Sequence, residues 1–155
     1  MNPIFKKLKY KDQKQIHIIN APDSFKKDMN EMKPLTSIKT TLTSAKPIEF
    51  FMAFVIKQKE LDELIKKMKS LMIDDGVLWF VYPKGTSKKY VCEFNRDTGW
   101  AELGKAGYEP VSAVAIDEDW SGLRFRNSTY IKKMTRSFAM TETGKKKIAA
   151  TKRYK

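Results

Sequence analysis

The sequence is poor in the residues that carry most catalytic and metal chemistry. It has one cysteine, Cys92, and one histidine, His17, in 155 residues. A single cysteine excludes a disulfide within the chain, and no cluster of Cys and His is available to hold zinc. The motifs HExxH, CxxC and GxSxG are absent, so hydrolytic and zinc chemistry have no support. We therefore predict no cofactor, no metal and no catalytic residue, and we favour a protein that is not an enzyme.

Long hydrophobic runs are absent too. The longest run, residues 50–56, is far shorter than the roughly 20 residues that a transmembrane helix needs. The first ten residues, MNPIFKKLKY, carry charges but not the apolar stretch of a signal peptide. These absences predict a cytoplasmic protein, and the length predicts one folded domain.

What the sequence has in excess is positive charge at its two ends. The formal net charge is +13. Residues 1–14 hold five lysines and one aspartate, and residues 127–155 hold nine Lys or Arg and one glutamate, so residues 15–126 are close to neutral. This pattern predicts a basic N-terminal arm over residues 1–14, an α/β domain over 15–126, and a basic C-terminal tail over 127–155 that docks in part.

Basic segments of this kind often contact polyanions, although they can also serve solubility alone. We expect weakly sequence-specific contacts with nucleic acid or another polyanion, because no RRM, helix-turn-helix or zinc-finger pattern is present. The candidate contact residues all lie in the tail: Lys132, Lys133, Arg136, Lys145, Lys146, Lys147, Lys152 and Arg153.

Hydrophobic periodicity predicts strands and helices in alternation. The expected strands are residues 16–19, 37–42, 48–56, 77–82, 111–116 and 123–126, and the expected helices are residues 25–32, 59–72 and 97–106. The tripeptide DDG, which ends at Gly76, is expected to stop the long helix in a turn.

The order of these elements predicts the fold class. The two all-apolar strands, 48–56 and 77–82, belong at the centre of the sheet, since both of their faces must be covered. The short connection DEDWSG makes the last two strands antiparallel. The predicted fold is a single three-layer α/β sandwich, with a mostly parallel sheet of about five to six strands and a C-terminal antiparallel hairpin.

Several segments together resemble a family of small stand-alone bacterial proteins of unknown function. These segments are INAP, FFMAFV, DGVLWFVYPKGTSKK, NRD, GYEPVSAVAIDEDWSGLRFR and YIKKMTR, and they cover residues 15–136. The family resembles a shortened form of the Rossmann-like, methyltransferase-type sheet. MIDDGVLWF is similar to a late helix-to-strand junction of those enzymes, and the final hairpin is similar to their last two strands. The resemblance implies a fold and carries no activity.

The sequence departs from those enzymes at two places that matter for a cofactor. A dinucleotide or S-adenosylmethionine site needs glycines after the first strand, where this chain has Asn20, Ala21, Pro22 and Asp23. The acidic residue expected at the end of the second strand, for the ribose hydroxyls, is missing as well. Both absences argue against a cofactor site of the usual form.

One turn remains as a candidate binding site. It follows the apolar strand 77–82 and combines lysines, hydroxyls and a glycine, so it could hold a phosphate or a carboxylate. The candidate residues are Asn20, Lys84, Gly85, Thr86, Ser87 and Lys88. The alternative is an ordinary solvent loop in which Ser87 caps the next helix. Two functions therefore stay open: a non-enzymatic polyanion-binding module, or a degenerate methyltransferase-like protein that binds a nucleotide, phosphate or S-adenosylmethionine-like ligand.

Overall fold

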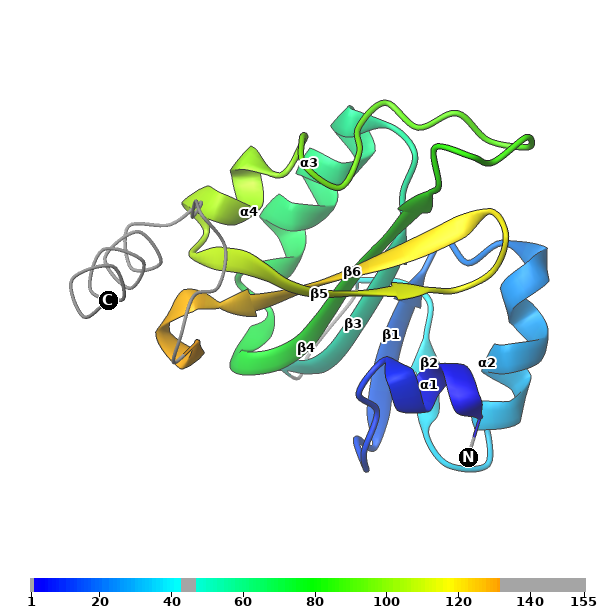
Figure 1. Cartoon of the computed structure of the whole chain (residues 1–155). Coiled ribbons are helices and arrows are strands. Elements are labelled where there is room, and N and C mark those ends of the chain that lie inside the picture. The colour runs from blue at the N-terminus through cyan, green and yellow to red at the C-terminus, as the bar shows by residue number, and fades with distance from the viewer. Residues whose placement is uncertain (1, 43–46, 132–155) are drawn as a thin grey trace, which may run out of the picture.

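The computed structural model describes residues 2–42 and 47–131, which form a six-stranded sheet with helices on both faces (Figure 1). The strands are β1 (Gln15–Ile19), β2 (Ser37–Lys39), β3 (Ile48–Phe54), β4 (Met72–Pro83), β5 (Tyr108–Ala115) and β6 (Trp120–Asn127), in the order β2-β1-β3-β4-β6-β5. The first four strands in this order are parallel, and β6 is antiparallel to both β4 and β5. The predicted mostly parallel sheet with a C-terminal hairpin is confirmed.

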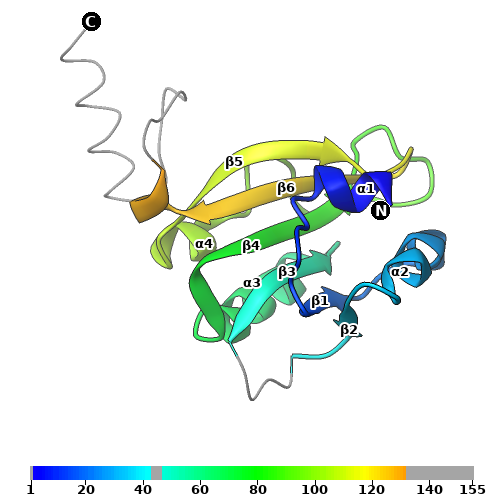
Figure 2. The same cartoon turned by 90° about the horizontal axis from the view of Figure 1, so that it is seen from below.

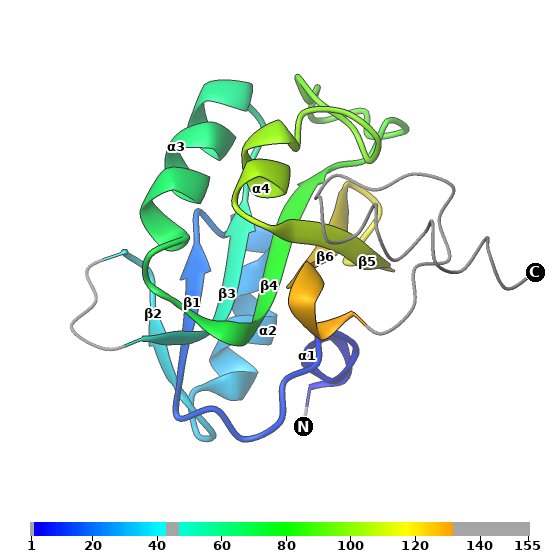
Figure 3. The same cartoon turned by 90° about the vertical axis from the view of Figure 1, so that its left-hand side faces the viewer.

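The helices form the two outer layers. On one face lie α3 (Gln58–Met68) and α4 (Ala101–Lys105), and on the other lie α1 (Pro3–Lys7) and α2 (Lys26–Met32) (Figure 1; Figure 3). Figure 2 views the second face, with α1 in front of β6. Short 3-10 turns occur at Asp23–Phe25 and Ser128–Tyr130. Among the described residues, no helix has the length and apolar character that crossing a bilayer requires.

The central strands bury both of their faces. Consecutive side chains of a strand point to opposite sides of the sheet, so β4 serves two cores. Leu78 and Phe80 pack with α3 and α4, while Trp79 and Val81 pack with α1. All four side chains are fully buried. The neighbouring strand β3 is buried in the same way from Phe50 to Phe54, which confirms the central place predicted for the two apolar strands.

The junction between α3 and β4 differs from the prediction. The helix expected over residues 59–72 ends at Met68, and β4 begins at Met72 and runs through Gly76. The prediction that Gly76 forms a turn is wrong, because this residue lies inside β4. Glycine is needed there because a larger residue would not fit. A Cβ atom there would lie 3.3 Å from the backbone oxygen of Ile48 and 2.6 Å from Cε of Met72. Glycine lets β3 and β4 approach each other closely.

The helix expected over residues 97–106 is shorter than predicted and begins at Ala101. The side chain of Asn95 explains the late start, because its oxygen accepts hydrogen bonds from the backbone N–H groups of Asp97 (2.8 Å) and Thr98 (3.0 Å). Such a local bond offers the backbone an alternative to a helical turn. Residues 95–98 therefore form a tight turn ahead of α4.

The charge pattern predicts a basic arm at the N-terminus and a basic tail at the C-terminus. The structure describes the arm from residue 2 onward and the tail only as far as residue 131. The N-terminal segment contains α1, and the side chains of Phe5, Leu8 and Tyr10 are buried against the sheet. At the other end, Ile131 is 8% exposed and is the last described residue. All eight tail residues predicted to contact a polyanion lie outside the described residues.

Candidate functional site

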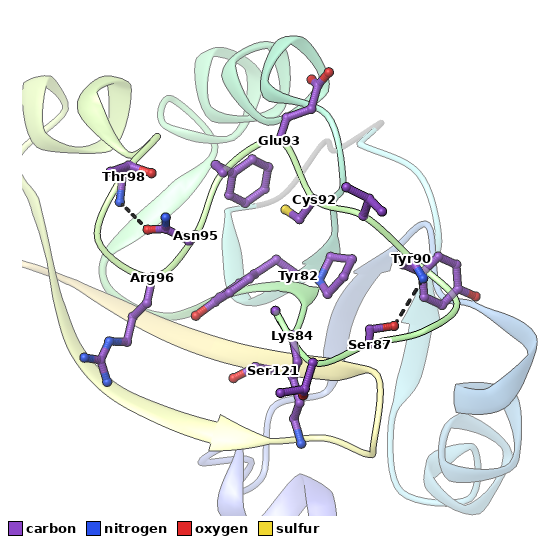
Figure 4. Close-up of a pocket in the computed structure, with 15 residues that line it drawn as sticks. Tyr82, Lys84, Ser87, Tyr90, Cys92, Glu93, Asn95, Arg96, Thr98 and Ser121 are labelled. Carbon is purple, nitrogen blue, oxygen red and sulfur yellow. Dashed lines mark hydrogen bonds between the residues drawn. The ribbon is translucent and has the colours of Figure 1, made fainter.

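A cleft of about 690 Å³ lies at the carboxyl end of β4 (Figure 4). Strand β4 contributes Tyr82 and Pro83, and β6 contributes Ser121. The rest of the lining comes from the loop between β4 and α4, through residues 84–87, 90–96 and Thr98. In open α/β sheets, ligands bind outside the carboxyl ends of the parallel strands. The cleft occupies that position.

The loop that walls the cleft is fixed at its far side. The backbone N–H of Glu93 donates to the carbonyl oxygen of Ile56 at 3.0 Å, just beyond the end of β3. Gln58, the first residue of α3, reaches the loop twice: its backbone N–H donates to Glu93 Oε1 at 2.9 Å, and its Nε2 donates to the carbonyl oxygen of Gly99 at 2.8 Å. These bonds hold the loop against α3, so the cleft has a formed wall.

Two hydroxyl groups meet on the sheet side of the cleft. Tyr82 and Ser121 are register partners across β4 and β6, so their side chains lie next to each other on one face of the sheet. Burial raises the pKa of the Tyr82 hydroxyl, and the neighbouring Ser121 side chain offsets only part of that rise. Tyr82 is therefore a neutral phenol at physiological pH, able to donate a hydrogen bond but not to act as a base.

The thiol of Cys92 also lines the cleft, and it is not activated. Burial is the main cause that raises its pKa, and Sγ makes a weak contact of 3.6 Å with the carbonyl oxygen of Ile56. A thiol needs a lowered pKa to act as a nucleophile. Cys92 therefore serves as a small, partly buried side chain in the lining.

The charged side chains of the cleft favour an anion. Lys84 and Arg96 supply two positive charges, and Glu93 supplies one negative charge. The Glu93 carboxylate accepts the bond from the Gln58 backbone, and Figure 4 shows its side chain pointing away from Tyr82. Arg96 lies 3.7 Å from Asp97, but both side chains are about 70% exposed, so that pair is weak.

Four of the six predicted anion-site residues line the cleft, namely Lys84, Gly85, Thr86 and Ser87. The other two do not. Lys88 is exposed outside the lining, and Asn20 lies at the end of β1, which β3 separates from β4. Asn20 has a φ of 59°. It therefore adopts the left-handed conformation that glycine favours, which Asn tolerates better than most residues.

Ser87 holds the turn together. Its Oγ accepts hydrogen bonds from the backbone N–H groups of Lys89 (3.2 Å) and Tyr90 (3.1 Å) and donates to Asp119 Oδ1 at 2.8 Å. The backbone N–H of Lys84 donates to the carbonyl oxygen of Asp119 at 2.8 Å, which ties the same turn to the β5–β6 hairpin. The Ser87 hydroxyl is thus committed to the protein, as the capping alternative expected, although no regular helix follows at once.

Sequence reasoning missed Tyr82, Arg96 and Ser121 as lining residues. Ser121 could have been found from the hairpin, because antiparallel pairing brings the start of β6 beside the end of β4. Arg96 could not, because it reaches the cleft through an irregular loop that carries no periodic signal.

Within residues 2–42 and 47–131, no group of three His, Cys, Asp or Glu side chains could hold a metal.

The sequence matches no protein-family model and no curated protein. The structure is similar to the crystal structure of a SAM dependent methyltransferase from Aquifex aeolicus, with a TM-score of 0.56 and 10% sequence identity over 79% of this chain and 86% of that chain. The chain has a Rossmann-like, methyltransferase-type fold. This confirms the predicted fold class and the resemblance to a shortened methyltransferase sheet.

A second similar structure is the N-methyltransferase NodS from Bradyrhizobium japonicum WM9 in complex with S-adenosyl-L-homocysteine. Its TM-score is 0.47, and the identity is 19% over 74% of this chain and 67% of that chain. At such identities a likeness describes the fold alone, because one fold supports many functions.

Proposed function

We propose that this protein binds a small anionic ligand in the cleft at the carboxyl end of β4. The observation that carries the proposal is that two cationic side chains, Lys84 and Arg96, and two hydroxyl-bearing side chains, Tyr82 and Ser121, line one cleft of about 690 Å³. Sites for small molecules are commonly clefts of this size with a few converging polar groups. The two cations select for negative charge, and the hydroxyls supply hydrogen bonds that orient the ligand.

The proposed role is binding without catalysis. Neither Tyr82 nor Cys92 is in the protonation state that base or nucleophilic chemistry needs, because burial raises both pKa values. The candidate ligands are a nucleotide and a free phosphate, and S-adenosylmethionine, a net cation, enters through its carboxylate group alone. The fold makes S-adenosylmethionine a natural member of the test panel, and the lack of glycines after β1 argues against its usual mode of binding.

Ligand-induced stabilisation tests this proposal. The full chain is titrated with phosphate, AMP, ATP and S-adenosylmethionine while thermal unfolding is recorded. A ligand at 100 times its Kd stabilises the folded state by about 2.7 kcal/mol. For a chain of this size, that raises Tm by roughly 5–10 °C. We expect Lys84→Ala and Arg96→Gln each to weaken the shift.

The matched control is Lys88→Ala, which removes a lysine of the same turn that does not line the cleft. It should leave the shift unchanged. The absence of a shift with every ligand, or an equal loss in Lys84→Ala and Lys88→Ala, would count against binding in the cleft.

A second candidate function is binding of nucleic acid or another polyanion through the C-terminal segment. The observation in its favour is the charge of residues 132–155, which hold nine of the 31 Lys and Arg residues and one acidic residue. The test compares the full chain with a Lys145→Ala/Lys146→Ala/Lys147→Ala variant across a salt series. Each lost phosphate contact should reduce the log–log salt slope by about 0.9. An unchanged slope would argue against a role for these three lysines.

A further inference from the structure

The N-terminal segment is a folded part of the protein surface. The side-chain oxygen of Asn2 caps α1 by accepting from the N–H groups of Ile4 (2.9 Å) and Phe5 (3.2 Å). The Asn2 amide donates to Asp28 of α2 at 2.9 Å. Past the helix, Trp79 Nε1 donates to the carbonyl oxygen of Leu8 at 2.8 Å. The segment is therefore fixed both to α2 and to the central strand β4.

This anchoring decides which side chains face water. Phe5 and Leu8 are fully buried and Tyr10 is 6% exposed, so the apolar side of the segment packs into the core. The remaining side chains point outward, among them five exposed lysines: Lys6, Lys7, Lys9, Lys11 and Lys14. Within residues 2–42 and 47–131, none of these lysines forms an ion pair. No described acidic side chain therefore lies within ion-pair distance of these lysines, and Asp12 is the single acid among residues 2–14.

A sixth cation lies on the face of the sheet that the segment covers. Arg124 of β6 is the register partner of Trp79, so the two side chains lie on the same face of the sheet. Lys9 follows Leu8, whose carbonyl oxygen accepts the hydrogen bond of the Trp79 indole, so the lysine segment and Arg124 both adjoin Trp79. The five lysines and Arg124 are called the N-terminal basic surface below.

Among the residues that the structure describes, the Nε of Arg124 has no hydrogen-bond acceptor. This atom is buried, and no ion pair of Arg124 occurs in the described part of the chain. Asp75, whose charge raises the pKa of Arg124, is bound instead by Arg126 through two hydrogen bonds of 2.8 and 2.9 Å. Burial and the charge of Arg126 lower the pKa of Arg124. A half-buried cation with such an unpaired donor is stabilised by an incoming anion.

We infer that the N-terminal basic surface binds the phosphate backbone of a nucleic acid. The charges are distributed along nine residues of chain and one neighbouring strand, which suits a ligand whose negative charges repeat along its length. A membrane surface fits less well, because surface-binding segments insert exposed apolar side chains, and those of this segment are buried. The inference is independent of the cleft and of residues 132–155.

The test measures binding of the full chain to a random DNA duplex and a random RNA duplex across a salt series. The main variant is Lys6→Ala/Lys7→Ala/Lys11→Ala; Lys9 is kept because its φ of 69° makes the position sensitive to substitution. The matched control is Lys66→Ala/Lys67→Ala/Lys69→Ala, which removes three exposed lysines in and next to α3, on the opposite face of the sheet. Both variants change the net charge by the same amount.

We expect the main variant to bind at least about tenfold more weakly at low salt and to reduce the salt slope by about two to three units. The affinity and the salt slope of the control variant should stay close to those of the unchanged protein. Arg124→Gln should reduce the slope by about one unit, and Arg124→Lys should restore it. Circular dichroism of each variant shows whether the fold is retained.

Three outcomes would overturn the inference. Equal losses in the two triple variants would mean that net charge alone drives binding. Full binding by the main variant would mean that the surface is not used. Binding only to vesicles of phosphatidylserine and phosphatidylcholine, with no affinity for either duplex, would assign the surface to membranes. The cleft proposal is tested separately, because Lys84→Ala should leave duplex binding unchanged.

Discussion

The indole Nε1 of Trp79 donates a hydrogen bond of 2.8 Å to the carbonyl oxygen of Leu8, a residue 71 positions earlier in the chain. Both residues are fully buried. The bond joins the N-terminal segment to the centre of the sheet, where a carbonyl without a donor would be costly. It therefore places the lysines around Leu8 in a fixed position on the surface.

Replacing Trp79 by Phe should destabilise the protein markedly. The substitution leaves the buried Leu8 carbonyl without a donor, which costs about 1–3 kcal/mol, and the smaller ring adds a packing defect. We expect a total loss of about 2–4 kcal/mol, measured by urea unfolding followed by circular dichroism.

Trp100→Phe is the matched control for this prediction. The Trp100 indole donates to the carbonyl oxygens of Asn95 and Arg96, which belong to exposed loop residues that water can solvate. The loss in stability should therefore be smaller than for Trp79→Phe. Equal losses would mean that ring packing dominates and that the bond to Leu8 contributes little.

The central sheet was predictable from sequence because its physical signal is local. Strands that are covered on both faces must be apolar throughout, and β3 and β4 are. The α3–β4 junction was not predictable, since the need for Gly76 arises from the close approach of Ile48, far away in sequence. The N-terminal helix was missed for a related reason. Its lysines dominate the composition, and the few apolar residues between them signal burial only once the partner strand is known.

The candidate site was predictable in part for the same reason. Lys84 to Ser87 follow directly from an apolar strand end, which marks one edge of the sheet. Tyr82 and Ser121 meet through strand register, which depends on the hairpin, and Arg96 arrives through the folding of the loop. Asn20 was placed in the site because β1 ends at the same edge, but the strand order puts β3 between β1 and β4.

The loop around the cleft should be sensitive at Gly99. This residue has a φ of +97°, and a Cβ atom there would lie 2.5 Å from Cβ of Phe94 and 2.7 Å from Oε1 of Gln58. Gly99→Ala therefore combines backbone strain with a clash against two residues that shape the loop. We expect a loss of about 2–4 kcal/mol in unfolding free energy, with weaker ligand-induced stabilisation.

Gly107 separates the two contributions at Gly99. It has a φ of +91°, but an added Cβ would meet open space. Gly107→Ala should cost only the backbone strain, about 1–2 kcal/mol, and should leave the cleft unchanged. If Gly99→Ala lowers the unfolding free energy no more than Gly107→Ala does, the loop can shift to accommodate the added Cβ and does not form a fixed wall.

Ser87 should behave as a structural residue and not as a ligand contact. Ser87→Ala removes the acceptor for two backbone N–H groups and the bond to Asp119, so we expect a loss of about 1–2 kcal/mol. Ser87→Thr keeps the hydroxyl and should bind the cleft ligand as the unchanged protein does. Calorimetric titration of both variants makes the distinction. Loss of binding in Ser87→Thr, with stability retained, would point to direct contact with the ligand.

Stability should depend on pH through His17. The side chain is 1% exposed on the α3 side of β1, between Lys39 of β2 and Phe51 of β3. Within the described part of the chain, neither ring nitrogen has a hydrogen-bond partner. Burial first, and the charge of Lys39 second, lower the pKa of His17 below its usual 6.5. The folded protein therefore holds His17 neutral at pH values where the unfolded chain already binds a proton.

The sign of the effect follows from proton linkage. Since the folded pKa is depressed, the stability from neutral His17 is complete above pH 6.5 and is lost as pH falls below it, until the folded pKa is reached. Within that window the loss approaches about 1.4 kcal/mol per pH unit. His17 is the single histidine of the chain, so urea unfolding of the unchanged protein and of His17→Leu between pH 5 and 8 isolates its contribution. The difference between the two stabilities should be constant above pH 7 and change steadily below pH 6.5, because both proteins share the same carboxylates. A difference that stays constant over the whole range would show that the ring takes up a proton as readily in the folded state as in the unfolded one.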